Sequence, residues 1–158
     1  MNETLHSILL HVHSIGRWVV ILLLIIAIFN SLVAGDRPFI KSDANTGLLL
    51  IIFVDLMFLI GLVLWYFGAL GYKSLENYPG GFSAAMKDPI ARFFGMEHFV
   101  GMLVALVLVH IGKAQGRKKI SDKKKHMRTM AFYLIALIII LVSIPWPFMQ
   151  SGAGRSWY

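Results

Sequence analysis

Four apolar stretches, each as long as a membrane-spanning helix, constrain this chain more than any other feature. They cover about residues 9–34, 47–71, 92–112 and 129–149. A bilayer core about 30 Å thick takes roughly 20 helical residues, so each stretch is long enough to cross it once. None alternates apolar and polar residues as a transmembrane β-strand does. The sequence therefore predicts an all-α integral membrane protein, a four-transmembrane-helix bundle that forms a single domain over residues 1–158.

The rest of the chain offers no room for a soluble domain. The connections are short, and they cover residues 35–46, 72–91 and 113–128. The chain is 58% hydrophobic and only 15% charged, which is more apolar than one soluble core requires. The residues before the first stretch include no Lys or Arg, and that stretch is longer than the core of a secretory signal, so we expect it to be retained. The lipid bilayer is the expected partner.

The distribution of basic residues predicts the orientation. Of the 15 Lys and Arg residues, eight lie in the third connection: Lys113, Arg117, Lys118, Lys119, Lys123, Lys124, Lys125 and Arg128. The positive-inside rule places that connection in the cytoplasm and both termini on the opposite side of the membrane. Because this topological role explains the net charge of +7, we expect no nucleic-acid partner.

Ionisable residues within the apolar stretches are the first candidates for function, because they are costly in a membrane. They are Arg17, Asp55, Glu97 and His98, to which we add three histidines nearer the membrane faces, His11, His13 and His110. Residues four apart share a helix face, so a helix that presents His13 to the bundle interior presents Arg17 there as well. A cation in that place needs an acid. We therefore expect an intramembrane ion pair between Arg17 and either Glu97 or Asp55.

Two of the histidines match in depth. At 1.5 Å per residue, His13 lies about 6–9 Å below the outer boundary of its helix and His98 about 9 Å below the same boundary. A b-type haem needs two neutral imidazoles on facing helices, an apolar slot and cations for its propionates. Glycines three residues from these histidines would leave space for a flat ring: Gly16, Gly95 and Gly101. His13 and His98 are thus the expected ligands of a haem iron, and Arg17 the expected propionate partner.

Five short segments of the chain also carry a family resemblance. They are L-H-V-H-S-I-G-R-W at 10–18, A-A-M-K-D at 84–88, M-E-H at 96–98, K-H at 125–126 and V-S-I-P-W-P-F at 142–148. In this order they resemble a family of small four-helix bacterial membrane proteins catalogued as cytochrome b-like. The resemblance covers nearly the whole chain and implies a protein of the bacterial inner membrane, where the orientation predicted from the basic residues makes both termini periplasmic. It gives the family's polar positions here as His13, Arg17, Glu97, His98 and His126.

The leading hypothesis is a haem b-binding membrane electron-transfer protein or subunit. Its bis-histidine haem would lie near the outer face, between His13 and His98. A quinone, a periplasmic redox protein or other respiratory subunits would exchange electrons with it. No residue is suited to bond chemistry on a substrate, so whether the protein is an enzyme stays open, with an electron carrier or accessory subunit preferred.

A structural role for the same residues is the main alternative. Arg17 with Glu97 or Asp55 would then fix helix register as a buried ion pair, and the glycines would let helices approach closely. A small bundle with short loops suits a non-catalytic accessory or assembly subunit of a larger membrane complex.

Metal or proton transport is the third possibility. It is prompted by His11 and His13, by the methionines Met96 and Met102 on either side of His98, and by the membrane carboxylates. The chain has no cysteine, so metal chemistry would rest on histidine, methionine and carboxylate. Methionine at helical spacing, however, is more often a packing residue than a copper ligand.

Overall fold

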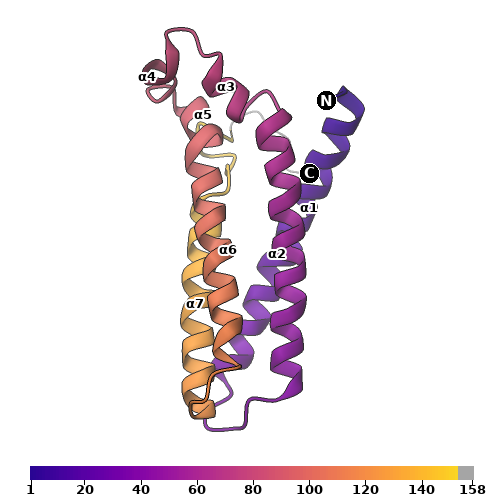
Figure 1. The fold of residues 1–158 in the computed structure, drawn as a ribbon, viewed down its shortest axis with the longest axis vertical. Helices are drawn as coiled ribbons and strands as arrows, with labels where there is room; N and C mark the ends of the chain where they lie inside the picture. Colours follow the sequence, from indigo (N-terminus) through magenta and orange to yellow (C-terminus); the bar gives the residue numbers. More distant parts are fainter. Residues whose placement is uncertain (153–158) are drawn as a thin grey trace.

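Four long helices dominate the computed structural model, which describes residues 1–152 (Figure 1). They are α1 (Glu3–Leu32), α2 (Lys41–Phe67), α6 (His98–Gln115) and α7 (Asp122–Val142). Three short helices lie between α2 and α6, namely α3 (Tyr72–Glu76), α4 (Gly81–Ala85) and α5 (Pro89–Arg92), and a π-helical turn, Phe93–Glu97, leads into α6. No strand occurs in residues 1–152. Four helices are long and apolar enough to cross a membrane, which confirms the predicted four-helix membrane bundle.

The four long helices form a closed ring. α1 packs against α2, α2 against α6, α6 against α7 and α7 back against α1. Helices that are adjacent in sequence are therefore neighbours in space, as short connections require. The N-terminal turns of α1 lean away from the bundle, while the three short helices cap the same end (Figure 1). The basic connection between α6 and α7 lies at the opposite end, which we call the basic end.

The interior of the ring is filled by small and aliphatic side chains from all four helices. Leu24, Leu50, Val109 and Ala136 come from α1, α2, α6 and α7 respectively, and each is fully buried. Most large apolar side chains face outward instead, as in Leu22, Leu59 and Ile138. Lipid tails are as apolar as leucine, so close packing rather than water exclusion holds such helices together.

The helix ends differ from the predicted spans for identifiable reasons. The fourth helix ends at Val142 rather than near 149, because Pro145 and Pro147 cannot donate to a continuing helix. It begins at Asp122 rather than 129, so the last seven residues of the predicted basic connection belong to this helix. The first helix begins at Glu3, where the Asn2 side chain accepts a hydrogen bond from the third helical N–H. Hydropathy marks the membrane-embedded part of a helix, whereas capping residues set its length.

The short helices form a cap with a small core of its own: Leu75, Ala85 and Ala91. Gly80 and Gly81 have φ angles of 85° and 78° at the turn that starts α4, a backbone conformation that glycine adopts without strain. Leu75 also packs on Gly95 at the π-helical turn, where a Cβ would lie 2.6 Å from the Leu75 Cγ atom. The cap is thereby fixed to the start of α6.

Asp88 ties the end of the cap to the start of α5. Its Oδ1 atom accepts the backbone N–H groups of Ile90 and Ala91 at 2.8 Å each, and its Oδ2 atom accepts the Tyr78 hydroxyl at 2.9 Å. The hydrogen bond from the Ala91 N–H group lowers the pKa of the Asp88 carboxyl most, and the one from the Tyr78 hydroxyl lowers it further below its ordinary value. Because the folded-state pKa is lowered, these contacts stabilise the cap above about pH 4 and are lost as the pH falls through the lowered pKa.

We predict that the Asp88 carboxyl, followed by carbon NMR in the micelle-bound protein, titrates below about 3.9. Tyr78→Phe removes one of the hydrogen bonds to the carboxylate, so it should raise that pKa while the fold persists. Titration at or above the ordinary aspartate value would contradict the capping role.

Candidate functional site

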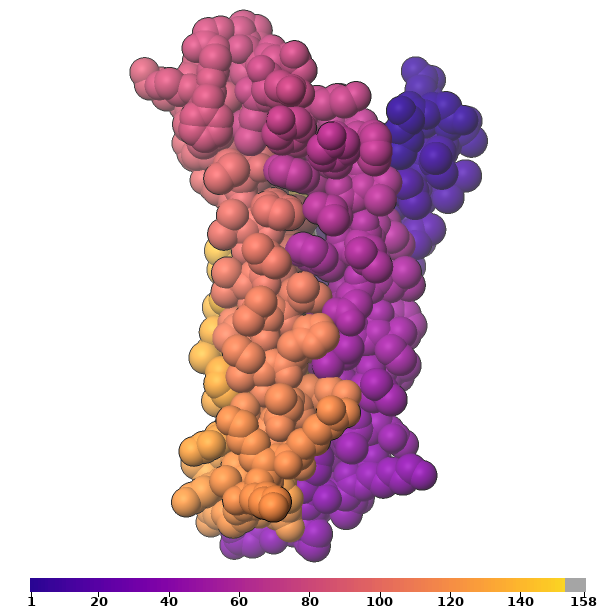
Figure 2. All heavy atoms as spheres, viewed as in Figure 1, coloured from indigo at the N-terminus to yellow at the C-terminus, as the bar shows by residue number. Residues whose placement is uncertain are grey.

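His13 of α1 and His98 at the start of α6 face each other inside the bundle. Their ring centroids are 6.3 Å apart and their planes meet at 74°. α1 and α6 stand diagonally across the ring of helices, so the two imidazoles meet in its interior. Both are only half-buried, because they line a cavity of about 170 Å³ with a mostly apolar wall that includes Met57, Phe58, Phe99, Met102 and Leu106. In the space-filling view a furrow between α2 and α6 lies over this half of the bundle (Figure 2).

The end of α7 fixes the orientation of His98. Its Nδ1 atom lies 2.7 Å from the backbone carbonyl oxygen of Ser143. A carbonyl only accepts, so Nδ1 donates and Nε2 keeps a free lone pair. The Ser143 carbonyl is available because α7 ends at Val142 and Pro147, four residues after Ser143, has no N–H to offer it. At Gly101, a Cβ would overlap the Ser143 side chain, so glycine permits this close approach.

His13 has a similar environment on α2. It lies beside the Met57 backbone, and its Nδ1 atom is buried with no partner in the described part of the chain. Gly61 makes room for the ring, since a Cβ there would lie 2.9 Å from the His13 Cε1 atom. His98 therefore donates to one backbone carbonyl and keeps Nε2 free, whereas the Nδ1 atom of His13 has no hydrogen-bond partner among the described residues. Metal-bound histidines are oriented in this way by carbonyl or carboxylate partners.

The separation of the two rings suits one metal ion between them. An imidazole nitrogen lies about 2.0 Å from a bound first-row metal and about 1.1 Å from its own ring centre, so two opposed imidazoles would have centres about 6 Å apart. The observed separation is 6.3 Å. The distance between the two rings is therefore compatible with one metal ion between them.

Arg17 lines the same cavity, one helical turn after His13. Its guanidinium carbon lies 5.4 Å from the centre of the Trp18 ring, a cation–π distance that holds the side chain at the helix surface. The expectation that His13 and Arg17 share a face of α1 is therefore met. The site combines two imidazoles with one permanent cation.

Glu97 is not brought to Arg17. It accepts a hydrogen bond from the Arg92 Nε atom at 2.6 Å, and both side chains are nearly half exposed. Glu97 directly precedes His98, and consecutive residues on a helix point about 100° apart. A backbone that turns His98 into the bundle must turn Glu97 outward.

Asp55 also has another partner. Its Oδ1 atom lies 2.8 Å from the His110 Nε2 atom on α6, with 43% and 45% of the two side chains exposed. Asp55 follows the buried Val54 and so points sideways toward α6 rather than inward to Arg17. Within the described residues, the predicted intramembrane ion pair of Arg17 with Glu97 or Asp55 does not form.

The other histidines lie away from this site. His11 is exposed, and its Nδ1 atom lies 2.6 Å from the Ser7 carbonyl one turn earlier. His126 lies in the part of α7 next to the basic end, 1% exposed, with its ring centroid 5.1 Å from that of Phe39. Of the five polar positions that the resemblance gives, three line the cavity: His13, Arg17 and His98.

The predicted role of the glycines needs correction. Each faces a protein side chain from another segment: Gly16 faces Met57, Gly95 faces Leu75 and Gly101 faces Ser143. They permit close approach between helices and do not border an empty slot. The free space lies instead beside the methionines and phenylalanines of α2 and α6.

Two features of the site had no counterpart in the sequence-based prediction. One is the π-helical turn Phe93–Glu97 directly before His98, a feature frequent at functional sites. There the Trp65 indole donates to the Gly95 carbonyl at 2.9 Å and its ring stacks on Phe99, which closes the cavity toward the cap. The other is the Ser143 carbonyl. The sequence does hold a signal for it, because Pro147, four residues later, has no N–H group to bond that carbonyl.

We predict that Gly101→Ala destabilises the protein by about 1–3 kcal/mol, the usual cost of overpacking a close contact. Ser143→Gly removes the overlapping atoms, so the double variant should recover most of that loss. Denaturant unfolding in micelles measures both, with Val104→Ala on the lipid-facing side of α6 as the control. A double variant no more stable than Gly101→Ala alone would show that the Gly101–Ser143 contact is not the cause.

Comparison with known proteins adds no relative on which to base the site's chemistry. No family model, no curated protein and no solved structure matches the chain. The described residues also contain no group of three or more His, Cys, Asp or Glu side chains that could hold a metal ion. The pair His13 and His98, with Arg17 beside it, is therefore the candidate site on its own geometry.

Proposed function

We propose that the protein binds haem b between His13 and His98 and serves as a membrane electron-transfer protein or subunit. The observation that carries the proposal is the pair of facing imidazoles with ring centroids 6.3 Å apart. The Ser143 carbonyl supports it, because it accepts from Nδ1 of His98 and leaves Nε2 for iron, and the Nδ1 atom of His13 has no partner among the described residues. The resemblance to cytochrome b-like membrane proteins points in the same direction.

Each residue has a definite task in this proposal. His13 and His98 would hold the iron, and the Ser143 carbonyl would orient the His98 ring. Arg17 neutralises a propionate. The apolar wall of the cavity excludes water from the site. When bound, the haem supplies reversible one-electron chemistry.

The cavity has to widen to admit a macrocycle. Its volume of about 170 Å³ is smaller than the roughly 300–1,000 Å³ of ordinary ligand pockets. Met57 and Met102 line it, and methionine has three rotatable bonds that let it leave such a space readily. Rotation of these two side chains would open the region between His13 and His98 toward the furrow between α2 and α6.

Orientation and exchange partners belong to the same proposal. With the basic end in the cytoplasm by the positive-inside rule, the site lies near the periplasmic face of a bacterial inner membrane and the N-terminus is periplasmic. The predicted periplasmic C-terminus falls in residues 153–158, outside the described residues. A quinone or a periplasmic redox protein would exchange electrons with haem at that depth.

The first test is an absorption spectrum of the detergent-purified full-length protein made with adequate haem supply. Sharp α and β bands on dithionite reduction, with a shifted Soret band, are expected for low-spin bis-histidine haem. A flat visible spectrum under these conditions would overturn the proposal.

Single substitutions then test the ligands. His13→Ala and His98→Ala should each abolish the low-spin bands, because each removes one axial nitrogen. His11→Ala and His110→Ala are matched controls on the same two helices and should leave the spectrum unchanged. Equal loss in all four variants would point to a folding defect rather than to ligation.

A second candidate function, an accessory subunit of a larger membrane complex, is favoured by the Asp55–His110 pair. Both side chains are more than two-fifths exposed on the α2–α6 surface, in segments where lipid would otherwise surround them. Polar pairs facing lipid are costly, whereas a neighbouring subunit would cover them.

On this alternative the purified protein is colourless and co-purifies with other subunits in fixed ratio in mild detergent. Asp55→Leu with His110→Leu should then abolish the co-purification, while Glu97→Leu, which disrupts a similarly exposed ion pair near the cap, should not. A colourless protein that purifies alone and monodisperse would rule against the accessory role.

A further inference from the structure

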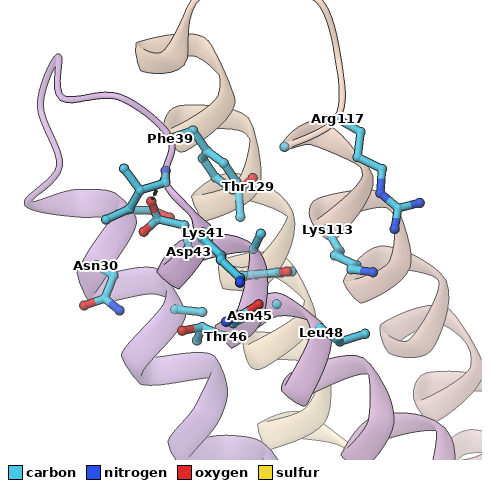
Figure 3. A pocket seen from close by; sticks show the side chains of 17 residues that line it. Asn30, Phe39, Lys41, Asp43, Asn45, Thr46, Leu48, Lys113, Arg117 and Thr129 are labelled. Carbon is cyan, nitrogen blue, oxygen red and sulfur yellow. Dashed lines mark hydrogen bonds between the residues drawn. The ribbon is translucent and has the colours of Figure 1, made fainter.

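A second cavity, unrelated to the histidine site, opens at the basic end of the bundle (Figure 3). Its volume is about 390 Å³, more than twice that of the cavity beside His13 and His98. Its wall is formed by the last turns of α1, the first two turns of α2, the end of α6 and the middle of α7. It therefore lies where all four long helices approach the membrane boundary.

Three cations line this cavity and have no acidic partner among residues 1–152. Lys113 lies in the last turn of α6, Arg117 in the turn that follows this helix, and Lys41 in the first turn of α2 (Figure 3). None of the ion pairs among the described residues involves them. The one acid in the wall, Asp43, is already neutralised by two hydrogen bonds from Arg37, at 2.7 and 2.8 Å. The cavity thus carries a positive charge that nothing in residues 1–152 compensates.

A buried hydroxyl group also belongs to the cavity wall. Tyr133 of α7 is 1% exposed, and its ring packs against Gly112 of α6, where a Cβ would lie 2.6 Å from the ring. Its hydroxyl reaches α2 at Gly47, 2.9 Å from the position of a Cβ. No described residue forms a hydrogen bond with that hydroxyl, whereas the neighbouring Thr129 hydroxyl donates to the Gly112 carbonyl at 3.1 Å. A buried polar group without a partner is costly, so a hydrogen-bond acceptor from outside the chain would satisfy it.

The backbone of α2 also favours a negative charge in this cavity. The cavity borders the first turn of α2, a 27-residue helix that begins at Lys41. The N–H groups of a first helical turn and the helix dipole both favour an anion at this position. Side-chain amides and hydroxyls from Asn30, Asn45 and Thr46 line the remaining polar wall.

We propose that this cavity binds a phosphate group. A phosphate offers several acceptor oxygens and more than one negative charge, which matches three unpaired cations, the Tyr133 hydroxyl and a helix N-terminus at once. Basic cavities between transmembrane helices at a membrane boundary bind the head groups of anionic lipids. The phosphate comes either from such a lipid or from inorganic phosphate, and the two sources differ in whether acyl chains accompany the charge.

The test is binding to the full-length protein in neutral detergent, measured by native mass spectrometry and by the shift in melting temperature. The three probes are phosphatidylglycerol, phosphatidylcholine and inorganic phosphate, at matched ionic strength. Binding of phosphatidylglycerol well above phosphatidylcholine, without an effect of inorganic phosphate, assigns a lipid head group. Binding of inorganic phosphate by itself assigns the free ion. Binding of neither anion overturns the proposal.

Matched variants locate the site. The double variant Lys113→Gln with Arg117→Gln should lower the affinity for the anion at least tenfold. The control, Lys118→Gln with Lys119→Gln, removes the same charge from the same connection outside the cavity and should change that affinity less than twofold. Tyr133→Phe keeps the ring between the glycines and removes only the hydroxyl, so it should weaken binding about fivefold to tenfold. Equal losses in both double variants, or no loss in Tyr133→Phe, would show general attraction to a basic surface and overturn the assignment.

Discussion

Inside a bilayer every backbone N–H and C=O group must find its partner within the protein, and the rest of this structure depends on that constraint. Regular helices satisfy it along most of the four spans. At the places where the helices are irregular or end, ring N–H donors meet backbone carbonyls: Trp65 with Gly95 at the π-helical turn and His98 with Ser143 at the end of α7. The irregular backbone around the candidate site is thus satisfied by the same side chains that shape it.

The two ends of the bundle have opposite electrostatic character. Around His13 and His98 the wall of the cavity is mostly apolar, and His98 donates a hydrogen bond to the Ser143 carbonyl. At the basic end the wall combines unpaired cations with a buried hydroxyl, which suits an anion. The fully buried layer of Leu24, Leu50, Val109 and Ala136 separates the two regions. One small bundle thereby has two chemically distinct cavities.

Glycines in both halves of the bundle allow groups from neighbouring helices to approach closely. Gly61 brings the His13 ring onto α2, and Gly101 brings the end of α7 to His98. Gly47 and Gly112 accommodate Tyr133 between α2 and α6. In each case a missing Cβ allows an aromatic ring or a backbone segment to reach a position that a larger residue would block. Sequence spacing identified glycines near the histidines, but it did not reveal which atoms would fill the space beside them.

The sequence by itself determined the number of spans, their order and the face that His13 shares with Arg17, because span length and helical periodicity are local properties. Only the tertiary structure decided which charges meet. Arg17 was predicted to pair with Glu97 or Asp55, yet Glu97 meets Arg92 and Asp55 meets His110. These partners depend on how each helix is rotated about its axis, and that rotation is set by packing against the other three helices rather than by any one segment. The π-helical turn before His98 and the Ser143 carbonyl that orients it arise from the same packing.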